Sequence, residues 1–215
     1  MKDWLMNFIR ELFTTRDNCA LCGRHTLELG KHGLCMACEE SLPRLDDDSM
    51  AAFHYEDAAA KLIRDFKYGE KLWIADILAG YMADRVRELD GKADVIVPVP
   101  LHSSRLRQRG FNQALKLAEG LGRELSIPVV DGLVRLRKTK TQTKLNHLER
   151  EANVRGAFKV KDEISFDGMT VMLVDDVVTT GSTLKACGEE ILKAGADEVI
   201  WVTAARTSEE KKEKE

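Results

Sequence analysis

Residues 171–184 read VMLVDDVVTTGSTL, and the predicted fold is built around this stretch. Its four apolar residues, 171–174, are too few for a helix and predict a fully buried strand. Asp175 and Asp176 follow directly. Two carboxylates are therefore expected at the carboxyl end of the strand, where open α/β sheets bind their ligands. A helix is expected from about residue 184 to about residue 193.

A turn rich in hydroxyl groups joins the predicted strand to the predicted helix. It offers hydroxyls, backbone N–H groups and one residue free to adopt a positive φ; its members are Thr179, Thr180, Gly181, Ser182 and Thr183. The positive end of the helix dipole and the unpaired N–H groups of the first turn point into the same place. The carboxylates can accept hydrogen bonds from a cis-diol and the turn can cradle a phosphate, so this stretch predicts a site for a phosphorylated sugar.

The alternative is an ordinary strand, turn and helix in which the Asp and Thr residues only cap the helix. Capping requires a single Ser, Thr or Asp, so it explains neither the acid pair nor the run of five residues. A Walker A phosphate loop is excluded, because the sequence contains no G-x-x-x-x-G-K segment.

The same stretch resembles the signature of the type I phosphoribosyltransferases, which bind 5-phosphoribosyl 1-diphosphate (PRPP). The resemblance consists of two acids, two spacer residues and the letters TTGST, all directly after an apolar strand.

Composition indicates a globular intracellular protein. Of the 215 residues, 44% are hydrophobic and 32% are charged, and the net charge is −3, so no global positive field recruits nucleic acid or an anionic membrane. No apolar run reaches the ~20 residues that a membrane span needs. Residues 1–13 are interrupted by Asp3, Arg10 and Glu11 and offer no small-residue cleavage site. We therefore expect no signal peptide and a cytoplasmic location.

Four of the five cysteines form two Cys-x-x-Cys pairs, Cys19 with Cys22 and Cys35 with Cys38. In a reducing compartment this spacing predicts a metal site, and four thiolates suit a closed, structural Zn²⁺ site. Iron in a rubredoxin-like site is the alternative, and His25 and His32 between the pairs are competing ligands. Cys187, the fifth cysteine, is expected to be a small buried residue on the helix after the acid pair.

Several further segments are predicted along the chain. The residues at helical spacing near the N-terminus, from Trp4 to Phe13, predict an amphipathic helix that packs on the domain or docks on a membrane surface or partner. Residues 94–100 predict a second buried strand, followed by Arg105, Arg107 and Arg109. Because these arginines follow a parallel strand, we expect a basic rim at the same sheet edge as Asp175, the alternative being a solvated basic turn. The basic residues 134–150 predict a long mobile lid.

Strands and helices alternate through the body, which predicts an α/β domain with a parallel sheet covered by helices on both faces. We expect three parts: an N-terminal helix and four-Cys zinc module over residues 1–45, the main domain over residues 50–206, and a disordered charged tail over residues 207–215.

Four segments together resemble the ComF family of phosphoribosyltransferase-like proteins, which are associated with DNA uptake in naturally transformable bacteria. They are the paired Cys-x-x-Cys knuckles; residues 105–113, RLRQRGFNQ; the series Thr139, Gln142, Leu145, Arg150 and Asn153 that leads to Gly156, Ala157 and Phe158; and VDDVVTTGSTL itself. Lys67 and Tyr68 add to them upstream. The resemblance implies the type I phosphoribosyltransferase fold with a small N-terminal zinc ribbon.

The resemblance also implies a role for each part of the site. Asp175 and Asp176 would hold the ribose hydroxyls, and residues 179–183 the 5-phosphate. The turn over residues 99–104 would grip diphosphate, through Val99, Pro100, Leu101 and His102. The flexible loop that closes over the site would contain Thr139, Gln142, Leu145 and Arg150. Mg²⁺ would be held mainly by the oxygens of PRPP and by water.

The expected function is transfer of the phosphoribosyl group to a nitrogen nucleophile with release of diphosphate, linked to DNA uptake or to nucleotide metabolism. Asp175, Asp176, Arg105 and Arg107 are the expected catalytic residues. The alternatives are a non-catalytic PRPP sensor and a single-stranded-DNA-binding component of the competence machinery, with a DNA-uptake helicase or other competence proteins as partners. Neither the acceptor nor the choice between monomer and homodimer follows from the sequence.

Overall fold

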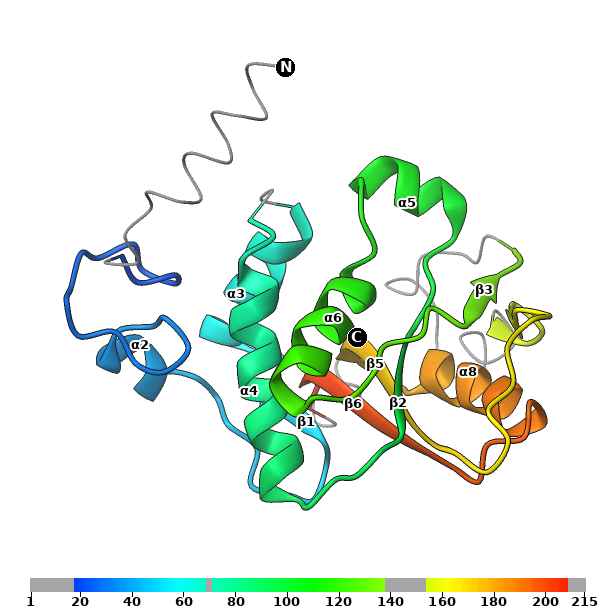
Figure 1. Cartoon of the computed structure of the whole chain (residues 1–215). Helices are drawn as coiled ribbons and strands as arrows, with labels where there is room; N and C mark the ends of the chain where they lie inside the picture. Colours follow the sequence, from blue (N-terminus) through cyan, green and yellow to red (C-terminus); the bar gives the residue numbers. More distant parts are fainter. Residues whose placement is uncertain (1–17, 69–70, 138–153, 209–215) are drawn as a thin grey trace. The chain divides into compact units, whose positions relative to one another are not determined.

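The computed structural model describes residues 18–68, 71–137 and 154–208 (Figure 1). The predicted N-terminal helix, the charged residues 209–215 and the flexible-loop residues Thr139, Gln142, Leu145 and Arg150 lie outside these ranges. The chain divides into two compact units, Met1–Leu42 and Pro43–Glu215. No helix in the described ranges is long and apolar enough to cross a membrane.

The first unit contains the four paired cysteines and little regular structure. Its single described helix is α2 (Met36–Glu40). Isolated antiparallel bridges join Asn18 to His25 and Leu29 to Cys35. Gly23 and Gly33, which follow the first pair and precede the second, both have a positive φ, +73° and +81°. A residue with a side chain would be strained in these turns.

A four-stranded parallel sheet forms the second unit, as the alternating pattern predicted. Its strand order is β1-β6-β5-β2, with β1 at Ala51–His54, β6 at Glu198–Arg206, β5 at Thr170–Val178 and β2 at Val95–Pro98. A separate antiparallel pair consists of β3 (Leu133–Arg135) and β4 (Phe158–Val160).

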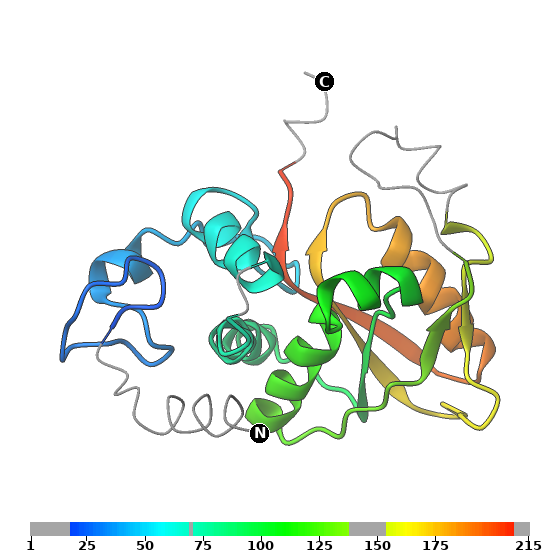
Figure 2. The same ribbon diagram turned by 90° about the horizontal axis from the view of Figure 1, so that it is seen from above.

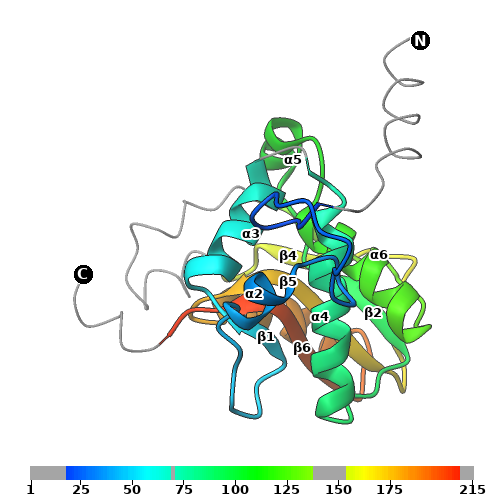
Figure 3. The same ribbon diagram turned by 90° about the vertical axis from the view of Figure 1, so that its left-hand side faces the viewer.

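Helices cover both faces of the parallel sheet, which confirms the predicted architecture (Figure 2). On one side α6 (Gln113–Leu125) packs on β2 and β5, and α4 (Ile74–Glu88) packs on β1 and β6; α3 (Asp57–Tyr68) packs against α4. Figure 3 looks at the unit from the side of α3 and α4. On the other side α8 (Ser182–Lys193) packs on β5 and β6.

The apolar periodicity in the sequence explains both layers of the core. In α6, Ala114, Leu117, Ala118 and Leu121 lie on one face and are buried, as helical spacing requires. Beneath α8, a second apolar cluster includes Val171, Leu173 and Cys187. Cys187 is fully buried, so the prediction for this residue is confirmed.

Strand β5 is longer than residues 171–174, so the prediction that the acids follow the strand is wrong. Beyond Val174 the strand still pairs with β6, where Asp175 lies opposite Thr203. On its other side the pairing ends at Val174, opposite Pro98 of β2. Proline has no N–H to donate, and β2 leaves the sheet after Pro98. The acid pair is therefore inside a strand but beyond the end of its neighbour.

Two basic segments have more regular structure than predicted. The residues after β2, which were predicted to form a basic rim or a solvated basic turn, form helix α5 (Ser103–Arg109), with His102 as its N-cap. Arginines at every second position of a helix are about 200° apart, so Arg107 lies on the opposite side of α5 from Arg105 and Arg109. The first residues of the predicted lid, 134 and 135, belong to strand β3, because they pair with β4.

Candidate functional site

The carboxyl ends of β2 and β5 bring three predicted segments to one edge of the sheet. The backbone N–H of Val99 donates to the carbonyl of Val174 (2.9 Å), so the turn after β2 starts directly beside the acid pair. Residues 179–181 continue from β5 into α8 at the same edge (Figure 1). Parallel strands place such ends together, and ligands bind there in open α/β sheets.

The two carboxylates of the acid pair face different neighbours, since consecutive strand residues point to opposite faces. On the side of α3, an oxygen of Asp176 (Oδ1) lies 3.0 Å from Nζ of Lys67. Asp175 interacts electrostatically with Cys187 of α8 and with Arg135 of β3. Its Oδ1 accepts the backbone N–H of Asp176 (2.8 Å). Lys67 is part of the ComF resemblance, but its contact with Asp176, more than a hundred positions away, was not predicted.

Burial raises the pKa of Asp175 from its usual 3.8 to about 7, and the neighbouring charge of Asp176 adds to the rise. The N–H of Asp176 and the positive charges of Lys67 and Arg135 act in the opposite direction. Two carboxylates this close, away from bulk water, resist carrying two negative charges. With a pKa of about 7, Asp175 is only partly ionised at neutral pH.

The residues from Thr179 to Ser182 turn the chain from β5 into α8. Gly181 is the N-cap, with φ +74°, so the N-cap residue itself offers no capping side chain. The Oγ1 of Thr180 accepts the backbone N–H of Ser182 at 3.5 Å. Asp175 and Asp176 lie inside β5, so capping of α8 does not account for the acid pair. The hydroxyls of Thr180 and Ser182 lie 2.8 Å apart. The backbone N–H groups at the start of this twelve-residue helix follow a glycine N-cap and form a favourable site for an anion.

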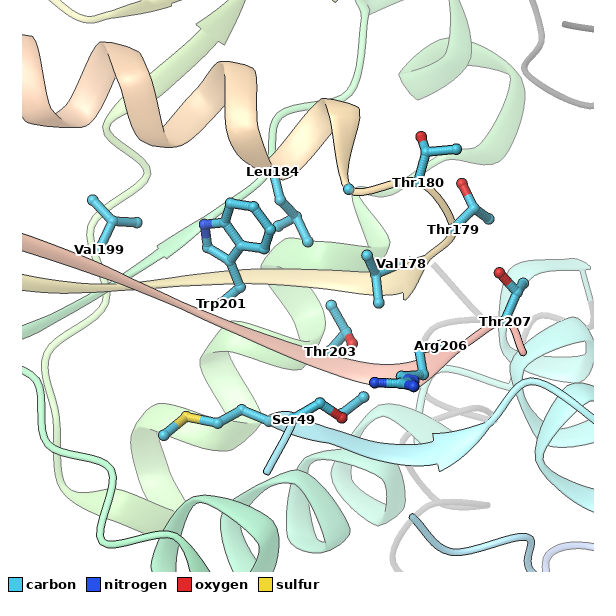
Figure 4. Close-up of a pocket in the computed structure, with 13 residues that line it drawn as sticks. Ser49, Val178, Thr179, Thr180, Leu184, Val199, Trp201, Thr203, Arg206 and Thr207 are labelled. Atoms are coloured by element: carbon cyan, nitrogen blue, oxygen red, sulfur yellow. The ribbon is translucent and has the colours of Figure 1, made fainter. Parts of the chain in front are cut away.

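Trp201 of β6 supports this turn from behind, a role that sequence reasoning missed. A Cβ on Gly181 would lie 3.3 Å from the Trp201 ring. Trp201 also lines a cavity of about 420 Å³ between the turn, β6 and the start of β1 (Figure 4). The cavity is bounded by Thr179, Thr180 and Gly181 but not by Asp175 or Asp176, so it lies behind the turn and apart from the acid pair.

Residues 109–113, which read RGFNQ, connect the end of α3 to the turn after β2. The guanidinium of Arg109 lies over the ring of Tyr68 (5.4 Å), and the ring of Phe111 packs on Phe66 (5.6 Å). The side-chain amide of Asn112 donates to the carbonyl of Val99 (3.1 Å), while its Oδ1 caps α6. This segment therefore acts as a structural brace for two parts of the site.

The predicted diphosphate turn and the two predicted catalytic arginines lie next to this brace. Val99 and Pro100 are buried, whereas Leu101 and His102 are half-buried. Arg105 is half-buried. The pKa of Arg135 is lowered mainly by the burial of Arg135 itself and, next, by the positive charge of Arg105. Arg107 is exposed. Of the two arginines, the structure thus brings Arg105 close enough to act on Arg135, whereas Arg107 lies on the opposite side of α5.

The four paired cysteines converge in the first unit. Their sulfur atoms, from Cys19, Cys22, Cys35 and Cys38, all lie within 4.8 Å of one another. The Sγ atoms of Cys22 and Cys35 are 3.9 Å apart. Tetrahedral Zn–S bonds of about 2.3 Å place the sulfurs about 3.8 Å apart, so this cluster is compatible with a zinc ribbon. Among the described residues, neither His25 nor His32 belongs to the cluster.

We predict that the purified protein contains one Zn²⁺ per chain and that Cys38→Ser loses most of it. Removal of one thiolate leaves an incomplete tetrahedral site. Elemental analysis and the Co²⁺-thiolate absorption of the cobalt-substituted protein measure this loss. Cys187→Ser is the control and should keep its metal, since this buried cysteine is outside the cluster. Iron in place of zinc, or full metal content in Cys38→Ser, would contradict the prediction.

We also predict that Asp175→Asn stabilises the unliganded protein at pH 8. The pKa of Asp175 is raised in the folded state, so its favourable contribution is present below about pH 4 and is lost as the pH rises through about 7. The amide in Asp175→Asn cannot ionise, so the variant does not lose this stability as the pH rises. Melting temperature should rise by a few degrees at pH 8, since about 1 kcal/mol corresponds to about 2–4 °C at this size. Near pH 4 the variant should match the wild type.

The exposed Asp197 provides the control, as Asp197→Asn should leave the melting temperature unchanged at both pH values. An equal shift for Asp175→Asn at both pH values would contradict an electrostatic cause.

Comparison with known proteins shows the family of the chain. A family model described as the phosphoribosyl transferase domain matches residues 66–215. Competence protein F of Haemophilus influenzae is 34% identical over 192 residues, which span 85% of this chain and 82% of that protein. Competence protein ComFC of Bacillus subtilis is 32% identical over 183 residues, spanning 82% and 72%.

Among solved structures, part of the chain matches glutamine phosphoribosylpyrophosphate (PRPP) amidotransferase from Bacillus subtilis, complexed with ADP and GMP. It is 25% identical with a TM-score of 0.41, and the match covers 60% of this chain and 26% of that chain. The family match spans well over half of the sequence, and the competence proteins match most of it. The chain therefore belongs to the phosphoribosyltransferase domain family, within its ComF group.

Proposed function

We propose that this protein binds PRPP and transfers its phosphoribosyl group to a nitrogen nucleophile, with release of diphosphate. The observation that carries the proposal is the position of the acid pair. Asp175 and Asp176 lie beyond the end of β2, and five residues later α8 begins with a glycine N-cap. Carboxylates for a cis-diol and helix N–H groups for a phosphate are thereby close enough for one sugar phosphate.

Each part of the site then has one role. Asp175 and Asp176 accept hydrogen bonds from the ribose hydroxyls. Backbone and hydroxyl groups of the turn bind the 5-phosphate, and these belong to Thr179, Thr180, Gly181, Ser182 and Thr183. The turn after β2 holds the diphosphate through Val99, Pro100, Leu101 and His102. These assignments rest on the positions of three segments at one sheet edge: the turn after β2, the acid pair of β5 and the turn from β5 into α8.

In the reaction, the bond from C1 of the ribose to diphosphate breaks as the bond from C1 to nitrogen forms. Positive charge develops on the ribose ring and further negative charge develops on the departing diphosphate. The carboxylates of Asp175 and Asp176 favour the positive charge, and Arg105 favours the negative one. Mg²⁺, held mainly by PRPP oxygens and water, neutralises part of the diphosphate charge when bound.

The biological setting is proposed from the relatives. Two of them are named competence proteins, so we propose a cytoplasmic role linked to DNA uptake or nucleotide metabolism, with other competence proteins as partners. The four-cysteine cluster supports a reducing compartment, and Zn²⁺ there has a structural role, because four protein ligands leave no open position.

A second candidate function, single-stranded DNA binding, is favoured by two exposed aromatic residues. The side chains of Tyr68 and Trp73 are 73% and 49% exposed, and Arg109 lies against Tyr68. Exposed rings beside basic groups can stack on unpaired bases. The double variant Tyr68→Ala with Trp73→Ala should weaken oligothymidine binding in a salt-dependent fluorescence anisotropy titration. Undetectable binding by the wild type at low salt would remove this candidate.

The acid pair provides the decisive test of the proposed reaction. Asp175→Asn combined with Asp176→Asn should abolish Mg²⁺-PRPP binding measured by calorimetry, since an amide is a weaker acceptor for the ribose hydroxyls. The exposed Asp197→Asn should bind as the wild type does. Retained affinity in the double variant would contradict the assignment.

Diphosphate release separates an enzyme from a sensor. The wild type should release diphosphate from PRPP with at least one member of a panel of nucleobases and amines. Binding of PRPP without release for any acceptor would support the non-catalytic alternative.

A further inference from the structure

Lys67 is a lysine in an unusual position, at the last turn of α3 and directed at the acid pair. Its Nζ is 3.0 Å from Oδ1 of Asp176, and both side chains are only 15% exposed. Lys61, on the same helix, lies equally close to Asp65 at 3.0 Å, but the Lys61 side chain is 48% exposed. An exposed pair of this kind contributes little to stability. The sheltered pair is different, because loss of one partner leaves the other charge poorly solvated.

The two neighbours of Lys67 are held by the brace of residues 109–113. Phe66 packs against Phe111, and Tyr68 lies under the guanidinium of Arg109. Asn112 of the same segment holds the carbonyl of Val99, where the turn after β2 begins. One short segment therefore fixes the end of α3 and the proposed diphosphate turn with respect to each other. Lys67 projects from this fixed point to Asp176.

The charged and titratable groups that face the acid pair come from three further elements. They are Lys67 of α3, Arg135 of β3 and Cys187 of α8, and Arg105 of α5 lies near Arg135. Lys67 lies next to Asp176, whereas Arg135 acts from the side of Asp175 and Cys187. Without the ammonium of Lys67, the two carboxylates would repel each other with less compensation, and the pair would retain a proton to higher pH.

We propose that Lys67 is a positioning residue of the ribose site: its ammonium fixes the carboxylate of Asp176 as a charged acceptor for a ribose hydroxyl. The proposal rests on the PRPP site proposed above. With Oδ1 of Asp176 engaged by Lys67, Oδ2 is the oxygen that accepts the hydroxyl. Lys67 is absent from the residues that the phosphoribosyltransferase resemblance assigns to the site, since it acts through Asp176.

The first experiment compares Mg²⁺-PRPP affinity by calorimetry across the range from about pH 6 to about pH 9. Lys67→Met should weaken binding roughly 10- to 100-fold near pH 7.5, as expected when a hydrogen bond to a charged group is lost. The loss should shrink as the pH rises and the pair gives up its proton. Lys67→Arg keeps the charge and should retain most of the affinity. Lys61→Met is the matched control and should behave as the wild type.

A second measurement needs no ligand and separates this proposal from the proposed function. Carboxyl carbon shifts of protein labelled with ¹³C in aspartate give the titration midpoints of Asp175 and Asp176. Lys67→Met should raise the midpoint of the acid pair by about 1–3 pH units, the usual effect of removing an opposite charge at this distance. Lys61→Met should not change it.

The outcomes are distinct. If the wild type does not bind PRPP, the proposed function fails, whereas the titration still tests the pairing of Lys67 with Asp176. Unchanged midpoints in Lys67→Met would overturn the proposal. So would a loss of affinity that is the same at every pH and equal in Lys67→Arg, because that pattern indicates a purely structural role.

Discussion

The candidate site depends on the unequal lengths of two neighbouring strands. β2 ends at Pro98, while β5 continues past Val174 with β6 as its partner. The continued pairing holds the backbone of Asp175 and Asp176 rigid, and the missing partner opens the edge of the strand toward the turn after β2. A shorter β5 would place the acids on a flexible loop, and a longer β2 would cover them. The acid pair of the candidate site therefore lies on a rigid strand with one open edge.

The same arrangement concentrates charge where water has limited access. Asp175 and Asp176 are adjacent, and burial together with the second carboxylate raises the pKa of Asp175 to about 7. Lys67 and Arg135 offset part of this repulsion from two different elements. In the unliganded protein this arrangement of charges lowers the free energy of unfolding. The apolar core must offset that loss. Binding sites commonly have this cost, since charges arranged for a ligand are not arranged for stability.

The two units of the chain obtain their stability in different ways. The second unit has apolar clusters on both faces of its sheet, whereas the first has one described short helix and a cluster of four thiol groups. A module of this size has too little apolar surface for a core, so a bound metal would supply much of its folding free energy.

The sequence alone determined the parallel α/β architecture, the two cysteine pairs, the burial of Cys187 and the order of acid pair, hydroxyl-rich turn and helix. These are local patterns of polarity and spacing, which the chain expresses without reference to distant residues. Only the tertiary structure decided how far β5 extends, that α5 is a helix, that Lys67 meets Asp176 and that Trp201 lies beneath Gly181. The caps of α5, His102 and Gly110, are local, but the other three depend on contacts between segments far apart in the chain. Local propensity does not encode such contacts, because pairing partners and burial decide them.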